Sequence, residues 1–99
     1  MKYITDIKEI HANNGGKIIP VPNGTVNGMY SKGYILYLCD GEHEGFSFVH
    51  HSREELFAEA ERMFDSVPDG YHLYYLRDNG VDSRNPSHIY WSLMGEFIK

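Results

Sequence analysis

Several patterns that commonly identify a protein are missing from this 99-residue chain. Its one cysteine, Cys39, excludes an intramolecular disulfide and a zinc site built from several cysteines. No apolar run approaches the roughly 18 residues that a membrane-spanning helix needs, and the N-terminal segment MKYITDIKEIH lacks the apolar core of a signal peptide. The sequence therefore predicts a soluble protein of the cytoplasm, or of the host cytoplasm if a phage encodes it.

Aromatic residues and acidic residues are present in an uneven distribution. Aromatic side chains make up 14% of the chain, with eight tyrosines, and tyrosine often serves contact surfaces as well as strands. The net charge is −5, yet residues 40–69 alone hold nine acids against two arginines, a net of −7. The excess negative charge therefore lies in one continuous third of the chain.

Two strand-like runs, GYILYLCD and GFSFVHH, are joined by the polar turn GEHE and predict a β-hairpin. If Asp40 lies opposite Gly45, then Cys39 faces Phe46, Tyr37 faces Phe48 and Ile35 faces His50. Alternation then predicts an aromatic face with Ile35, Tyr37, Cys39, Phe46, Phe48 and His50. The other face carries Tyr34, Leu36, Leu38, Ser47, Val49 and His51.

The hairpin leads into the best-defined element, an amphipathic helix predicted for residues 52–66. Ser52 is a good N-cap and Glu55 completes a capping box. One apolar stripe follows, formed by Leu56, Phe57, Ala60, Met63, Phe64 and Val67. We expect this stripe to pack on the aliphatic face of the hairpin, leaving the glutamates in solvent.

The remaining segments predict a small, single α+β domain over residues 1–99, with an antiparallel sheet of about four strands. TDIKEIH is a short helix or a strand, and residues 17–22 form an extended edge segment because two prolines cannot donate ladder hydrogen bonds. Residues 71–78 form a strand. Residues 87–98 fit a strand through alternating Ile89, Trp91, Leu93 and Phe97, although a helix remains an alternative.

Catalytic and metal-binding patterns are weak. The chain has no G-x-S-x-G elbow, phosphate-binding glycine loop or H-E-x-x-H helix. In the expected hairpin, Cys39 and His50 are four residues apart, roughly 13 Å, while His43 lies in the adjacent turn. We therefore predict no catalytic residue, no metal and no cofactor. A small enzyme or metal-binding protein that uses Cys39, His43 or His50 stays open as an alternative. An enzyme should have a cleft with Cys39 or a histidine next to a carboxylate.

The run GFSFV partly matches the strand signature of RNA-recognition modules. Gly45, Phe46, Phe48 and Val49 agree with it, whereas Glu44 stands where a basic residue belongs. Because this segment is also the most acidic part of the chain, nucleic acid is disfavoured as a partner. A nucleic-acid-binding module that uses an aromatic sheet face of Tyr37, Phe46 and Phe48 remains the first alternative.

By elimination, the sequence predicts a non-enzymatic module that binds a protein with a basic surface. Small acidic proteins of this kind are similar in type to phage or mobile-element antagonists of host nucleic-acid machinery, such as anti-CRISPR and anti-restriction proteins. The similarity is one of kind and no motif carries it. It implies an inhibitor that occupies a basic surface. The alternative for the acidic helix is a solvated face. No membrane contact is expected, and an open strand edge permits a homodimer.

The residues expected to contact the partner are the acids of the turn and of the helix, together with three hairpin aromatics: Glu42, Glu44, Glu54, Glu55, Glu59, Glu61, Asp65, Tyr37, Phe46 and Phe48.

Overall fold

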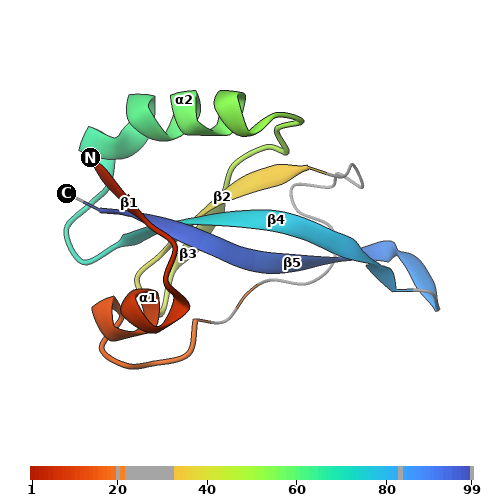
Figure 1. Cartoon of the computed structure of the whole chain (residues 1–99), viewed down its shortest axis with the longest axis horizontal. Coiled ribbons are helices and arrows are strands. Elements are labelled where there is room, and N and C mark those ends of the chain that lie inside the picture. The colour runs from red at the N-terminus through yellow and green to blue at the C-terminus, as the bar shows by residue number, and fades with distance from the viewer. Residues whose placement is uncertain (20, 22–32, 83, 99) are drawn as a thin grey trace.

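The computed structural model describes residues 1–19, 21, 33–82 and 84–98, and it has one antiparallel sheet with a helix on each face (Figure 1). The five strands lie in the order β1-β5-β4-β2-β3. They are β1 (Lys2–Ile4), β2 (Tyr34–Cys39), β3 (Glu44–Phe46), β4 (His72–Asp82) and β5 (Asn85–Ile98). This confirms the predicted α+β class, with one more strand than expected because β1 pairs with the end of β5. None of the described helices is long and apolar enough to cross a membrane.

Helix α2 (Arg53–Met63) confirms the main helix predicted from the sequence, and a tighter 3₁₀ turn, Phe64–Ser66, forms its end. The Ser52 hydroxyl accepts a hydrogen bond from the Glu55 N–H at 3.1 Å, which satisfies one of the free donors of the first turn. The apolar side of the helix packs on one face of the sheet, in a core that contains Leu36, Leu56, Ala60, Leu73, Tyr75 and Phe97.

Helix α1 (Ile7–Asn13) lies on the opposite face of the sheet, so the helical alternative for this segment is the correct one (Figure 1). The Asp6 carboxylate caps it by accepting from the Lys8 N–H at 2.9 Å. Ile10 is fully buried in a second core that contains Ile19, Ile35, Tyr37, Val49, Tyr74, Leu76 and Trp91. The aromatic sheet face is therefore covered by the chain itself.

The hairpin register differs from the predicted one by two residues. Tyr37 lies opposite Phe46 and Cys39 opposite Glu44, because Asp40 belongs to the turn rather than to the strand. The Asp40 carboxylate accepts from the backbone N–H groups of Glu42 and His43, at 2.9 and 2.6 Å, and this Asx-type turn closes the loop one residue earlier.

A second irregularity follows directly after β3. Tyr34 forms a bridge with His50, so three residues of this arm lie opposite two residues of β2. This bulge reverses the alternation of side chains. Val49 is consequently buried on the α1 side, and Phe48 is 70% exposed, contrary to the faces predicted from strict alternation.

The segment predicted as a strand at 71–78 begins at His72 and extends to Asp82, and the C-terminal strand is confirmed as β5. The two form a long hairpin whose tip projects beyond the helices (Figure 1). A register shift lies between Tyr75, opposite Gly95, and Leu76, opposite Leu93. As a result, Trp91 belongs to the core beneath α1, whereas Phe97 belongs to the core beneath α2.

The edge segment predicted for 17–22 lies partly outside the described residues, at positions 20 and 22. Its described positions 17–19 and 21 are not in a strand, and Ile19 is buried in the α1-side core. The homodimer that an open edge would permit stays a prediction.

Replacing Gly95 with alanine should destabilise the protein by about 1–3 kcal/mol, because the new methyl group overlaps the Tyr3 ring. A Cβ at position 95 would lie 2.4–2.6 Å from two ring carbons and the hydroxyl oxygen of Tyr3. The ring has little room to retreat, since Phe57 and Phe97 pack against it at centroid distances of 4.9 and 5.0 Å.

Urea unfolding of Gly95→Ala measures this cost. Gly45→Ala is the matched control, since a Cβ there meets no atom within 4 Å and should leave stability nearly unchanged. Equal stability of the two variants would show that the Tyr3 ring does not confine position 95.

Candidate functional site: an apolar groove beside an acidic helix

A groove lined by three predicted partner residues, Phe46, Phe48 and Glu59, lies between α2 and the segment that runs from β3 to His50. It exists because Gly45 has no side chain. Leu38 lies opposite Gly45 in the β2–β3 ladder and packs with the α2-side core, so both positions belong to that face of the sheet. The space that a side chain at position 45 would fill is empty to at least 4 Å.

Apolar side chains form most of the groove, whose volume is about 430 Å³. Leu36, Leu38 and Leu73 form its floor, and Met63 of α2 forms one wall. The opposite wall contains Phe48, which is the large hydrophobic residue most exposed within the groove lining. Glu59 reaches the rim from α2.

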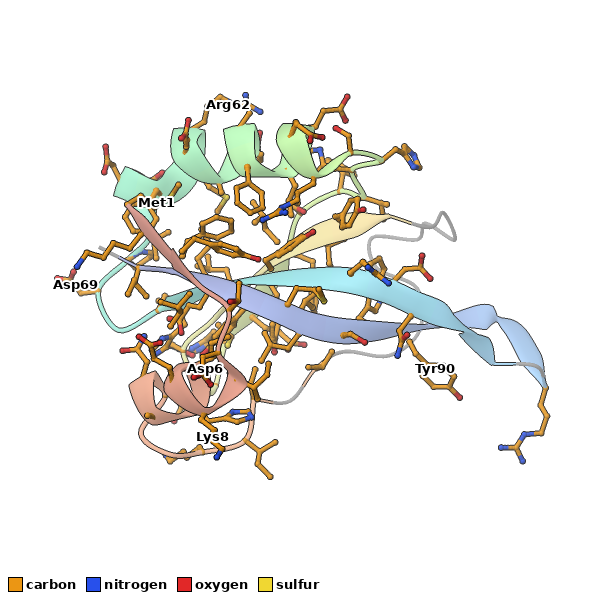
Figure 2. The ribbon with its side chains drawn as sticks, viewed as in Figure 1. Met1, Asp6, Lys8, Arg62, Asp69 and Tyr90 are labelled. Atoms are coloured by element: carbon orange, nitrogen blue, oxygen red, sulfur yellow. The ribbon has the colours of Figure 1, made fainter. Side chains whose placement is uncertain are left out.

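The acidic residues predicted on the main helix lie on its solvent side. Glu54, Glu55, Glu61 and Asp65 are exposed, and Glu59 is partly exposed. Both basic residues of α2 already have contacts: Arg62 pairs with Glu59, and the Arg53 guanidinium lies 4.8 Å from the centre of the Phe57 ring. Arg62 points away from the sheet on the outer side of α2 (Figure 2). The helix therefore presents a predominantly negative surface next to the groove.

The acids of the β2–β3 turn belong to a different part of the molecule. Glu44 accepts a hydrogen bond of 2.8 Å from the Tyr37 hydroxyl, which lies on the α1 side of the sheet. Together with Glu42 and His43 it lines a small hollow of about 70 Å³ beside the end of α1. The structure therefore does not bring Glu42 and Glu44 together with the acidic residues of α2.

The three predicted aromatic contact residues also separate. Tyr37 is 1% exposed and stacks on the half-buried Phe46, with the rings nearly parallel and 5.1 Å apart. The Tyr37 ring is thus a core residue, which corrects its placement on a contact surface and removes it as a stacking platform for bases. Only Phe48 presents most of its ring to solvent, and it does so on the α2 side.

Cys39 is buried, and its neighbours across the sheet are Glu44 of β3 and His72 of β4. Burial raises the pKa of the Cys39 thiol, with a smaller opposing effect of the hydrogen bond to Tyr37. His43 lies in the turn, with its Nδ1 atom 3.2 Å from the Asp40 carboxylate. Hydrogen bonds from the backbone N–H groups of His43 and Glu42 lower the pKa of Asp40 to about 2. The described residues include no group of three or more potential metal ligands.

A histidine beside a carboxylate does occur elsewhere, in a cleft of about 380 Å³ between the end of α1, residues 64–72 and the end of β5. The Nδ1 atom of His72 lies 2.8 Å from Oε2 of Glu96, which also accepts a hydrogen bond of 3.0 Å from the Asn13 side chain. Glu96 is 1% exposed. Within the described part of the chain, Glu96 Oε1 and the nearby Tyr74 hydroxyl have no hydrogen-bond partner.

Sequence reasoning missed the roles of Gly45, His72 and Glu96. A signal existed for Glu96, because a charged residue inside the apolar run SLMGEFI has to find a partner if the strand is buried. Gly45 gave a signal as well, since a glycine inside a strand pattern often marks an unusual surface or a close approach. Nothing in the sequence paired His72 with Glu96, because they meet only through the β4–β5 register.

Comparison with known protein families, curated proteins and solved structures found no match to this chain. The function therefore has to be argued from the residues themselves.

The Cys39 thiol should react slowly in the folded protein, because burial keeps it protonated at neutral pH and shields it from reagents. We expect iodoacetamide to alkylate native Cys39 at least about tenfold more slowly than Cys39 in the denatured chain. Mass spectrometry of timed samples measures both rates, with a small peptide thiol as the control for the effect of denaturant. Faster labelling of the native protein would indicate an activated nucleophile.

Proposed function

We propose that the protein is a non-enzymatic binding module that attaches to a positively charged surface of a partner protein. The observation that carries this proposal is the exposed row of acids on α2 beside an apolar groove with a 70% exposed phenylalanine, Phe48. An exposed apolar patch with a polar rim is typical of protein interaction sites. The negative charge would attract a basic partner over long range and exclude acidic ones.

The class of partner follows from the arrangement of the acids. Glu54 and Glu61 are seven residues apart along the outer side of α2, and the exposed Asp65 follows in the 3₁₀ turn at its end, so the negative charge extends along the helix. A line of negative charges is what a surface that binds DNA or RNA phosphates would accept. We therefore propose a nucleic-acid-handling protein as the partner and occupation of its basic surface as the inhibitory action.

Reversing the charges of Glu54, Glu59 and Glu61 to lysine should weaken capture of the partner by roughly tenfold or more, since attraction becomes repulsion. The test is affinity capture from nuclease-treated lysate of the native host, with wild type and variant as baits. Bound proteins are identified by mass spectrometry at low and at high salt, because salt screens exposed charges.

A matched control reverses two exposed acids elsewhere, Glu9 and Asp69, and places lysine at two exposed neutral positions, Ala12 and Asn79, which changes the net charge by the same amount. This control should retain the partner, and circular dichroism verifies that both variants are folded. A partner held equally by wild type and by the α2 variant, or one held only through nucleic acid, would contradict the proposal.

A second candidate function is acid–base chemistry in the cleft, which one observation favours. His72 is held by a buried carboxylate at 2.8 Å, while 23% of its side chain stays exposed. A carboxylate that accepts from Nδ1–H leaves Nε2 as the basic nitrogen.

If His72 is a general base, the protein should hydrolyse some member of a panel of nitrophenyl esters and phosphates, and His72→Gln should abolish that turnover. His43→Gln, in the exposed turn, is the control and should keep it. Turnover that is absent in wild type, or unchanged in His72→Gln, would leave this candidate without support.

A further inference from the structure

We infer that the groove at Gly45 is an anchor site that receives one large apolar side chain from a segment of the partner in which lysines or arginines flank that side chain. This rests on the proposed function, a basic protein partner, and adds which part of the partner is recognised and where.

The shape of the groove supports an anchor of this size. A volume of about 430 Å³ lies within the range of roughly 300–1,000 Å³ found for pockets that bury ligands. Its floor is apolar and fixed, because Leu36 and Leu73 are each 1% exposed and belong to the core. An incoming leucine or phenylalanine would occupy the space that position 45 leaves empty, opposite Leu38.

The charge at the rim supports a basic segment. Glu55, Glu59 and Met63 are spaced by four residues, so they follow one line along the side of α2 that borders the groove. Among the described residues that line the groove, none is a lysine or an arginine. A fatty acid or a nucleic-acid phosphate would meet the carboxylate of Glu59 at this rim, whereas lysines beside an apolar anchor would meet Glu55 and Glu59.

The same charge disfavours a second copy of this chain as the occupant. A two-fold symmetric contact places the same patch on both partners, so each rim of glutamates would face the other. A separate partner with the opposite charge has no such penalty.

Interfaces of this kind depend on a few anchors packed in desolvated pockets, so filling the pocket should be sufficient to block binding. Gly45 is suited to this test. Its φ is not among the positive values found at other glycines, and a Cβ there meets no atom, so Gly45→Leu should fold normally while its side chain fills the groove. Phe48→Ser removes one wall, and Ile18→Ser is the control, an 83% exposed apolar residue outside the groove.

The probes are two hexapeptides, one with leucine and phenylalanine between pairs of lysines and one with two serines in their place. Binding is measured by the shifts of backbone amide NMR signals in wild type and in each variant. We expect the apolar peptide to bind wild type and Ile18→Ser alike, with shifts centred on Leu38, Gly45 and Met63. Gly45→Leu and Phe48→Ser should bind it at least about tenfold more weakly, which corresponds to about 1.4 kcal/mol. Melting temperatures near or above that of wild type verify that the variants are folded.

Three outcomes would overturn the inference. If both peptides bind equally and only salt weakens them, the acidic face binds cations without an anchor, and the proposed function survives. If neither peptide binds, the anchor site is absent, and the capture experiment with the α2 charge variant decides separately on the proposed function. If wild type self-associates and Gly45→Leu does not, the occupant is a second copy of this chain.

Discussion

The hydrogen bond from the Leu36 N–H to the Ser47 hydroxyl, 2.9 Å long, is the interaction on which the candidate site depends. In a regular ladder a backbone carbonyl would accept from Leu36. Because a side chain accepts instead, one extra residue enters the strand and the alternation of faces reverses. Phe48 then turns outward beside the groove and Val49 turns into the α1-side core. Regular pairing would have put Phe48 on the other face.

The electrostatics of the acidic surface follow from the amphipathic helix that sits over this bulge. The apolar stripe of α2 has to face the sheet, which leaves the intervening acids in solvent, where each keeps its hydration at little cost. Arg53 lies over the aromatic rings of Tyr3 and Phe57, and Arg62 pairs with Glu59. Neither arginine therefore pairs with the other acids on the outer side of α2. The negative surface is thus a consequence of packing α2 on the core of its own side of the sheet, while its position beside an exposed phenylalanine is a consequence of the Ser47 bulge.

The parts of the fold that were predictable are those that depend on local sequence. The helix at 52–66 follows from its N-cap and its periodic apolar residues, and the long C-terminal strand follows from alternation. Register was not predictable, because it depends on whether Asp40 joins the strand or caps the turn, and local patterns support both. Of the candidate site, the solvent side of the acids of α2 was predictable, whereas Phe48 was predicted as a contact residue but on the wrong face of the sheet. The groove was not, since an empty space over Gly45 appears only when β3 and α2 are placed side by side.

The two hollows differ in whether the fold already explains their residues. In the cleft, Glu96 is nearly inaccessible and bonds both to Asn13, at the end of α1, and to His72 of β4. Burying a carboxylate is costly, and the charge-assisted hydrogen bonds with Asn13 and His72 offset much of that cost. The bond from Asn13 also fastens α1 to the sheet. The cluster therefore has a structural role whether or not the cleft binds anything. Among the described residues, none gives the exposed Phe48 or the unfilled position 45 a comparable internal role. A hydrophobic side chain at 45 would bury more apolar surface and stabilise the domain. An opening that lowers the stability of the fold is better explained by binding to a partner than by packing. For that reason we base the functional proposal on the groove rather than on the cleft.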